Sequence, residues 1–304
     1  MALDPSPMML AGGRAQTGSV VALLAGAAAI GTSALFVKVS EVGPVSSAFW
    51  RVFLALPVLW LWARMEARDS RSTDSPDDWK LLMLAGLFFA GDLAVWHWSI
   101  VLTSVANATL LANCAPIFVT LAAWLLLHQR PNGLFVAGLV TALCGMVLLL
   151  RGDFQHAGTA LIGDALGVIT AMFYAAYQLT VTRARQSMST ARIMATSGAV
   201  TAGILLPIAL LSEERFIPVS GEGWLVLLGL ALFAHAAGQS LIAYAMAHLP
   251  ATFSSVGLLL QPVIAAALAW LLLGEVLSTL AIGGGVLVLL GIRIAHAAQR
   301  PVSA

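Results

Sequence analysis

The apolar stretch 91–100 (GDLAVWHWSI) is the richest part of the chain in side chains that could do chemistry. A carboxylate, an imidazole and two indoles, from Asp92, His97, Trp96 and Trp98, fall within about two helical turns. The indole faces could sandwich a flat or apolar group of a ligand, while Asp92 or His97 could hold an ammonium or relay a proton. We therefore expect these four residues to line a binding cavity. The alternatives are an interfacial aromatic belt for the tryptophans and a neutral, packed Asp92.

Hydrogen-bonding side chains recur in two later apolar stretches. These are Tyr174, Tyr177 and Gln178 in one stretch, and His235, Gln239 and Tyr244 in the other. Residues three or four apart share a helical face, so each set contains a polar face within an apolar helix. We expect both sets to face a central ligand. For His235 and Gln239 the alternative is hydrogen bonding that only joins helices.

Two prolines follow short polar segments at corresponding places in the chain. Asn113 precedes Pro116, and Gln261 precedes Pro262. A proline inside a helix frees a carbonyl group and bends the helix, so we expect both prolines to act as hinges. Asn113 and Gln261 are expected to line the path of the ligand.

Two cations lie near the ends of apolar stretches. Arg51 and Lys38 could attract a carboxylate. The commoner role of such residues is to extend to the membrane surface, and the sequence favours that role here.

The elements that position these residues must be membrane helices. The 304 residues are 60% hydrophobic and only 10% charged, whereas a soluble domain carries about 25% charged residues. Ten apolar blocks each reach the roughly 20 residues needed to cross a bilayer; they cover about 18–38, 44–64, 79–101, 104–127, 132–150, 161–183, 189–211, 221–247, 250–273 and 278–297. We predict an all-α integral membrane protein with ten transmembrane helices.

Composition also excludes several classes of function. The net charge of +1 leaves no basic surface for nucleic acid. Cys114 and Cys144 both lie in apolar stretches, and they supply neither a disulfide framework nor a metal site. No catalytic motif such as a serine elbow, an HExxH pair or a phosphate-binding loop occurs, so we expect no cofactor, no metal and no enzymatic activity.

The placement of cations predicts the orientation in the membrane. Most of the 15 Lys and Arg residues fall on one side if the N-terminus is cytoplasmic, as short cytoplasmic loops require. We predict a multi-pass protein of the plasma (inner) membrane with both termini in the cytoplasm.

The chain repeats itself with an offset of 146 residues. The matched pairs are Pro116 with Pro262, Trp124 with Trp270, Gly138 with Gly284 and Gly145 with Gly291. Five spans per copy is an odd number, so the second copy enters the membrane from the opposite side, as in transporters with inverted repeats. We predict a cytoplasmic tail (1–17), a first repeat (18–150), a connector (151–160), a second repeat (161–297) and a cytoplasmic tail (298–304).

These features resemble the drug/metabolite transporter superfamily and its EamA-type repeat over residues 18–297. The resemblance lies in AFWR (48–51), LTSVANATLLANCAP (102–116), LPATFSSVGLLLQP (249–262) and LLLGE (271–275). The chain most resembles the aromatic amino acid exporter branch. This resemblance implies a plasma-membrane exporter of amino acids and related metabolites. The family often closes both halves with an acidic residue, whereas this chain has Glu275 in the second half and Gln129 in the first.

We therefore expect a secondary transporter that exports amino acids, preferably neutral or aromatic ones, by alternating access of its two halves. Its expected partners are a small-molecule substrate and the lipid bilayer, with a monomer as the working unit. Efflux of other metabolites or cationic drugs is the main alternative, followed by a passive channel or an intramembrane enzyme. Proton-coupled and facilitated transport both remain open.

Overall fold

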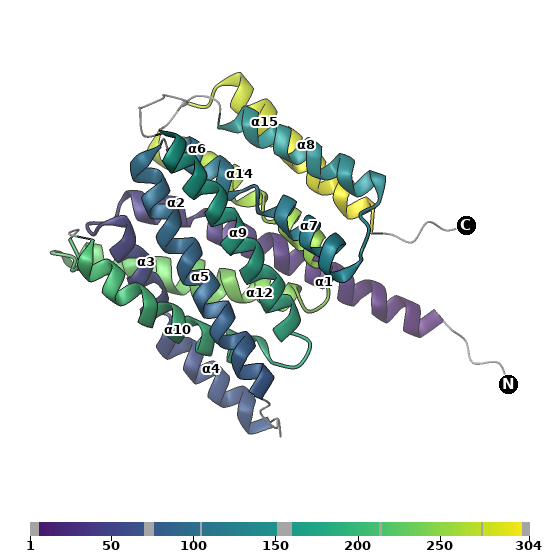
Figure 1. Cartoon of the computed structure of the whole chain (residues 1–304), viewed down its shortest axis with the longest axis horizontal. Coiled ribbons are helices and arrows are strands. Elements are labelled where there is room, and N and C mark those ends of the chain that lie inside the picture. Colours follow the sequence, from purple (N-terminus) through teal and green to yellow (C-terminus); the bar gives the residue numbers. More distant parts are fainter. Residues whose placement is uncertain are drawn as a thin grey trace.

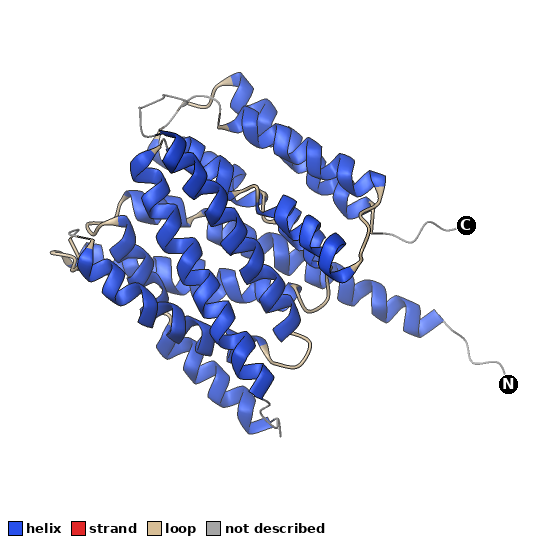
Figure 2. Ribbon diagram, in the orientation of Figure 1, coloured by secondary structure: helices blue, strands red, loops and turns tan. Residues whose placement is uncertain are grey.

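The computed structural model describes residues 6–69, 76–103, 105–150, 160–212, 215–274 and 276–299. All regular structure in these residues is helical (Figure 2). Nine described segments are long and apolar enough to cross a membrane, and a shorter apolar helix covers Gly133–Leu149. The prediction of an all-helical membrane protein is thus confirmed. Residues 1–5, 151–159 and 300–304, which hold much of the predicted tails and connector, lie outside the described residues.

Most helices of the two halves lie within the predicted blocks, but α1 begins at Ser6, inside the stretch 1–17 that was expected to be a tail. The first half contains α1 (Ser6–Gly31), α2 (Ser33–Lys38), α3 (Pro44–Phe53), α4 (Leu56–Asp69), α5 (Pro76–Leu102), α6 (Val105–Ala112), α7 (Ala115–Leu127) and α8 (Gly133–Leu149). The second half contains α9 (Ala160–Ala184), α10 (Thr190–Leu211), α11 (Gly221–Gly229), the π-helix η2 (Leu230–Gln239), α12 (Ser240–Ala245), α13 (Ala251–Gly257), α14 (Leu260–Leu273) and α15 (Thr279–Ala297).

Side-chain caps fix where several of these helices begin. The Asn132 side chain accepts a hydrogen bond from the Phe135 amide at the start of α8, and Ser278 does the same for Ala281 at the start of α15. Each cap satisfies one of the amide groups that a helix leaves free at its N-terminus. The two caps stand 146 residues apart, at the start of the last helix of each half.

The ends of α7 and α14 repeat the same geometry. His128 and Gly274 follow these helices in the left-handed conformation, with φ of 55° and 68°. Backbone amides at these two helix ends donate hydrogen bonds to the carbonyl groups of Ala123 and Ala269. Both pairs differ by the offset of 146 found in the sequence, so the repeat extends to backbone conformation. Glycine adopts this conformation without steric cost, whereas histidine rarely does.

The two halves interleave. α1 packs against η2, α12 and α14, while α9 packs against α5, α6 and α7. α10 fills the space beside α3, α4 and α5. α8 and α15 lie side by side along one edge of the bundle (Figure 1). Each of these contacts joins one half to the other.

Glycines bring α8 and α15 into backbone contact. A Cβ atom on Gly291 would lie 2.6 Å from the Gly138 carbonyl oxygen, and one on Gly145 would lie 2.7 Å from the Gly284 carbonyl oxygen. In the repeat, Gly138 corresponds to Gly284 and Gly145 to Gly291. The contact therefore exchanges equivalent residues, as an interface around a two-fold axis does. This is the geometry expected of inverted halves.

This contact predicts different effects for two substitutions on α15. A methyl group added to Gly291 would lie 2.6 Å from the Ala142 Cβ atom, whereas nothing lies within 4 Å of the corresponding position on Gly283. We expect Gly291→Ala to lower the free energy of unfolding by about 1–3 kcal/mol through overpacking. Thermal unfolding of the full chain in detergent measures this effect. Gly283→Ala is the control, and equal destabilisation by both variants would contradict the packing described.

Candidate functional site

Three helices from the two halves converge on a stack of aromatic rings. The Phe89 ring of α5 stacks on Tyr177 of α9, with ring centroids 4.8 Å apart, and on His235 of η2, at 5.6 Å. Tyr174 stacks on Tyr177 at 6.2 Å. Tyr177 and His235 are buried. The structure thus brings together Tyr174, Tyr177 and His235 of the sixth and eighth spans, and it adds Phe89 of the third span, which was not among the expected site residues.

The polar atoms beside this ring stack are only partly hydrogen-bonded. The Gln239 amide donates to the Tyr177 hydroxyl group at 3.1 Å. Both ring nitrogens of His235 and both amide atoms of Gln178 are buried, and none has a partner among the described protein groups. An unsatisfied buried polar group costs about 1–3 kcal/mol. The centre of the bundle therefore offers hydrogen-bonding capacity that another molecule can use.

His235 and Gln239 lie on an unusual helix. η2 is a π-helix of 10 residues inside an otherwise α-helical span. π-Helical turns occur mostly as short insertions, often at functional sites. The sequence predicts an ordinary α-helix here. Residues four apart share a face in both helix types, so the spacing of His235 and Gln239 does not reveal a π-helix. The widened helix keeps both side chains buried in the bundle.

Tyr174 and Gln178 also line a small cavity. Its wall includes Asn113 and Pro116 from the fourth span and Leu258 from the ninth. The space available to water is about 10 Å³, which is enough for one water molecule. In this conformation the space beside these polar groups is therefore too small for an amino acid.

Both spans that carry the prolines are broken at this level. The chain turns between α6 and α7 just before Pro116, and between α13 and α14 just before Pro262. Gln261 on α14 interacts with Tyr174, while its amide nitrogen is buried and has no partner in the described part of the chain. Broken helices at matching positions of two repeats commonly mark a transporter's binding site.

Two ionisable groups accompany this cluster. The half-buried Asp92 of α5 and Arg51 of α3 interact electrostatically with each other and with both tyrosines. Arg51 was expected at the membrane surface, but its Nε atom is buried in the bundle. Sequence alone could not find this, because an arginine near the start of a span looks the same in both settings.

Two expected site residues are not part of this cluster. Trp98 is 50% exposed on α5, and Tyr244 is 46% exposed, with its ring 5.1 Å from His248. Tyr244 leaves the inner face because it lies five positions beyond Gln239 and each position turns the helix by about 100°. We leave both out of the candidate site.

The other two aromatic residues of the 91–100 stretch are placed differently. Trp96 is half-buried one turn beyond Asp92 on α5. The side chain of His97 lies outside the described part, so its expected place in the cavity stays a prediction.

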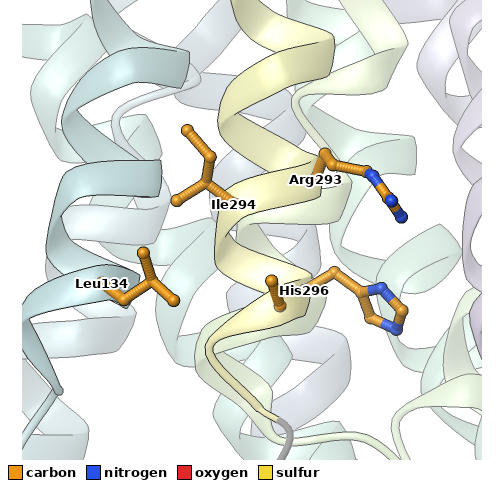
Figure 3. A pocket seen from close by; sticks show the side chains of 5 residues that line it. Leu134, Arg293, Ile294 and His296 are labelled. Carbon is orange, nitrogen blue, oxygen red and sulfur yellow. The ribbon is translucent and has the colours of Figure 1, made fainter.

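A larger groove lies elsewhere, between one end of α8 and the end of α15. It measures about 200 Å³ and is lined by Leu134, Arg293, Ile294, His296 and Ala297. Figure 3 shows Leu134 and Ile294 between the two helices, while Arg293 and His296 extend to the other side of α15. The groove does not gather polar groups around one point, so we do not regard it as the functional site.

A latch joins the two halves at one end of the bundle. Glu41 accepts hydrogen bonds from the Val219 and Ser220 amides and from the Ser220 hydroxyl group. The Trp50 indole donates to the Phe216 carbonyl oxygen at 2.7 Å. The Ser220 hydroxyl group is the main reason why the pKa of Glu41 lies below its ordinary value, followed by the Val219 amide. The sequence analysis missed this contact, because its partners are far apart in the chain.

The latch predicts a dependence of stability on pH. A lowered carboxylate pKa contributes stability that is present above about pH 4.3 and is lost as the pH falls through the folded-state pKa. We expect Glu41→Gln to unfold more easily than the unmodified protein at pH 7, and we expect this difference to vanish at low pH. Thermal unfolding between about pH 3 and pH 7 measures it, with Glu222→Gln as the control. A difference that does not change with pH would contradict the latch.

An all-helical bundle of two inverted halves, with broken helices and unsatisfied polar groups at its centre, is the architecture of a membrane transporter. The sequence comparison agrees with this class. The chain belongs to the EamA-like transporter family, whose model matches residues 17–151 and 161–296.

Several curated relatives share much of the chain. An uncharacterized transporter of Archaeoglobus fulgidus is 24% identical over 88% of this chain and 93% of its own length. The pseudopaline exporter CntI of Pseudomonas aeruginosa is 26% identical over 68% of this chain and 72% of its own. A "Probable terminal-alkyne amino-acid exporter" of Streptantibioticus cattleyicolor is 28% identical over 65% of this chain and 66% of its own.

A solved crystal structure has the same fold. It superposes with a TM-score of 0.79 and covers 95% of this chain and 99% of its own, at 18% sequence identity. The match to the EamA-like family model confirms membership of the drug/metabolite transporter superfamily, while the similarity to the aromatic amino acid branch stays a prediction.

Proposed function

We propose that this chain exports amino acids and related metabolites across the plasma membrane, with neutral and aromatic amino acids as preferred substrates. The observation that carries the proposal is the set of unpartnered polar atoms on Gln178 and His235, within the described residues, beside the ring stack of Phe89 and Tyr177. The amide and imidazole groups could bind a polar head group. The rings could contact an apolar or aromatic side chain.

The relatives support this substrate class. One exports pseudopaline and another bears the name of an amino-acid exporter. The family supports export as the direction of transport, and the cation distribution supports cytoplasmic termini; both belong to the same proposal.

Alternating access requires the two halves to move against each other. We assign the hinges to the breaks before Pro116 and Pro262, where turns with hydrogen bonds between residues three apart interrupt the regular α-helical pattern. The Glu41 latch closes one end of the bundle in this conformation. Opening at that end would have to break it. No nucleotide-binding motif occurs in the sequence, so a concentration or proton gradient would drive the cycle.

Efflux of other metabolites or cationic drugs is the second candidate. It is favoured by Asp92, a carboxylate within a span, because a cation in hydrocarbon needs such a partner. Arg51 weakens this candidate, since it interacts electrostatically with the same carboxylate. Asp92→Asn should abolish cation efflux if that is the activity.

Flux measurements in vesicles test the proposal. Purified protein in proteoliposomes should exchange labelled phenylalanine, tryptophan or leucine with saturable kinetics. Gln178→Leu removes two polar atoms at nearly constant size, and we expect it to reduce flux at low substrate about ten- to a hundredfold, the effect of losing hydrogen bonds to a charged group. Gln186→Leu is a matched control, because Gln186 is an exposed residue bonded to Arg183. The absence of saturable flux for every amino acid would contradict the proposal.

A further inference from the structure

Arg51 lies in an environment that does not suit a surface cation. It is near the end of α3, a helix that buries Ser47, Phe49 and Val52 against the bundle. The Arg51 Nε atom is itself buried and has no hydrogen-bond partner in the described residues. The guanidinium group interacts electrostatically with Asp92, Tyr174 and Tyr177.

Arg51 and Asp92 lie on two helices that pack together, α3 and α5, and Asp92 follows Phe89 of the ring stack by three positions, on the same face of α5. Neither Arg51 nor Asp92 forms a hydrogen bond or an ion pair with a described residue, although other side-chain pairs in the protein do. A guanidinium group carries five donors in a planar fork that fits a carboxylate with two parallel hydrogen bonds. Most of the binding capacity of Arg51 is thus unused.

The charge balance of this pair selects one class of ligand. Charges within hydrocarbon are costly unless they are paired, and an ionised Asp92 would balance the charge of Arg51. A ligand with a single charge would leave one charge of the site without a partner. A zwitterion leaves none, because its carboxylate can bind Arg51 and its ammonium can bind Asp92.

We propose that Arg51 and Asp92 form the head-group site for a zwitterionic α-amino acid, with Arg51 on the carboxylate and Asp92 on the ammonium. This inference rests on the proposed function and names the substrate class of the same site. The Phe89 and Tyr177 rings receive the side chain of the amino acid. Amines, amides and carboxylic acids that carry only one of the two charges are rejected.

Competition measurements test the assignment. The flux of labelled phenylalanine in proteoliposomes is measured in the presence of one of three unlabelled competitors. These are phenylalanine, phenylalaninamide, which lacks the carboxylate, and phenylpropionate, which lacks the ammonium. We expect the unmodified protein to prefer phenylalanine roughly tenfold or more over both analogues, the effect of losing one charge-assisted hydrogen bond. In Arg51→Gln we expect the half-saturating concentration of phenylalanine to rise by about the same factor, while inhibition by the amide stays unchanged. Loss of the phenylalanine and amide interactions in equal measure would overturn the role of Arg51.

Asp92→Asn gives the reciprocal result. It should weaken the binding of phenylalanine and phenylalaninamide and leave phenylpropionate unaffected. Lys38→Gln removes another cation of the first half, at the exposed end of α2, and should change none of these values. If Arg51→Gln does not fold, Arg51→Lys keeps the charge without the planar fork and should raise the half-saturating concentration less than about tenfold. An unchanged value in Arg51→Lys would overturn bidentate binding.

Ligand-induced thermal stabilisation separates this inference from the proposed function. The full chain in detergent should be stabilised by phenylalanine and not by phenylalaninamide, and Arg51→Gln should abolish the difference. Stabilisation without any flux would contradict the proposed export but support the head-group site. Flux with equal stabilisation by phenylalanine and the amide would support export and overturn the head-group site.

Discussion

The close backbone contact between the two halves determines much of the remaining structure. At Gly145 and Gly291, and also where Gly26 of α1 meets the Gly238 carbonyl oxygen, an added Cβ atom would lie less than 3 Å from the opposite helix. In a membrane, helices gain little from burying apolar surface, so such small-residue contacts supply the packing that holds them together. Because these contacts join the halves rather than lie within them, each half is completed by the other.

This interleaving has a consequence for the centre of the bundle. α5 from one half and α9 and η2 from the other are brought together there, and the side chains that meet are polar or aromatic. Polar groups within hydrocarbon are costly unless they find partners. Tyr177 and Gln239 satisfy each other, whereas Gln178 and His235 do not do so among the described groups. Packing thus imposes a cost at the centre that a bound polar ligand can offset.

Much of the fold could be predicted from the sequence, because length and composition distinguish membrane helices from other elements. The ten blocks and the offset of 146 residues define the spans and their inversion, and the structure repeats that offset at His128 and Gly274. The site was less predictable. Periodicity placed Tyr177 and Gln178 on an inner face, but it gave equal weight to Trp98 and Tyr244, which lie at the surface. It also overlooked Phe89 and Glu41 and favoured the membrane surface for Arg51, because the roles of these residues depend on contacts with residues distant in the chain.

The central claim is that the ligand binds between the two halves at this polar centre. The most direct test is a structure of the protein determined with a transported amino acid bound. The account predicts ligand density enclosed by α3, α5, α9 and η2, with its carboxylate on Arg51 and its side chain against Phe89 and Tyr177. Density in the groove between α8 and α15, or on the outer surface of the bundle, would contradict it.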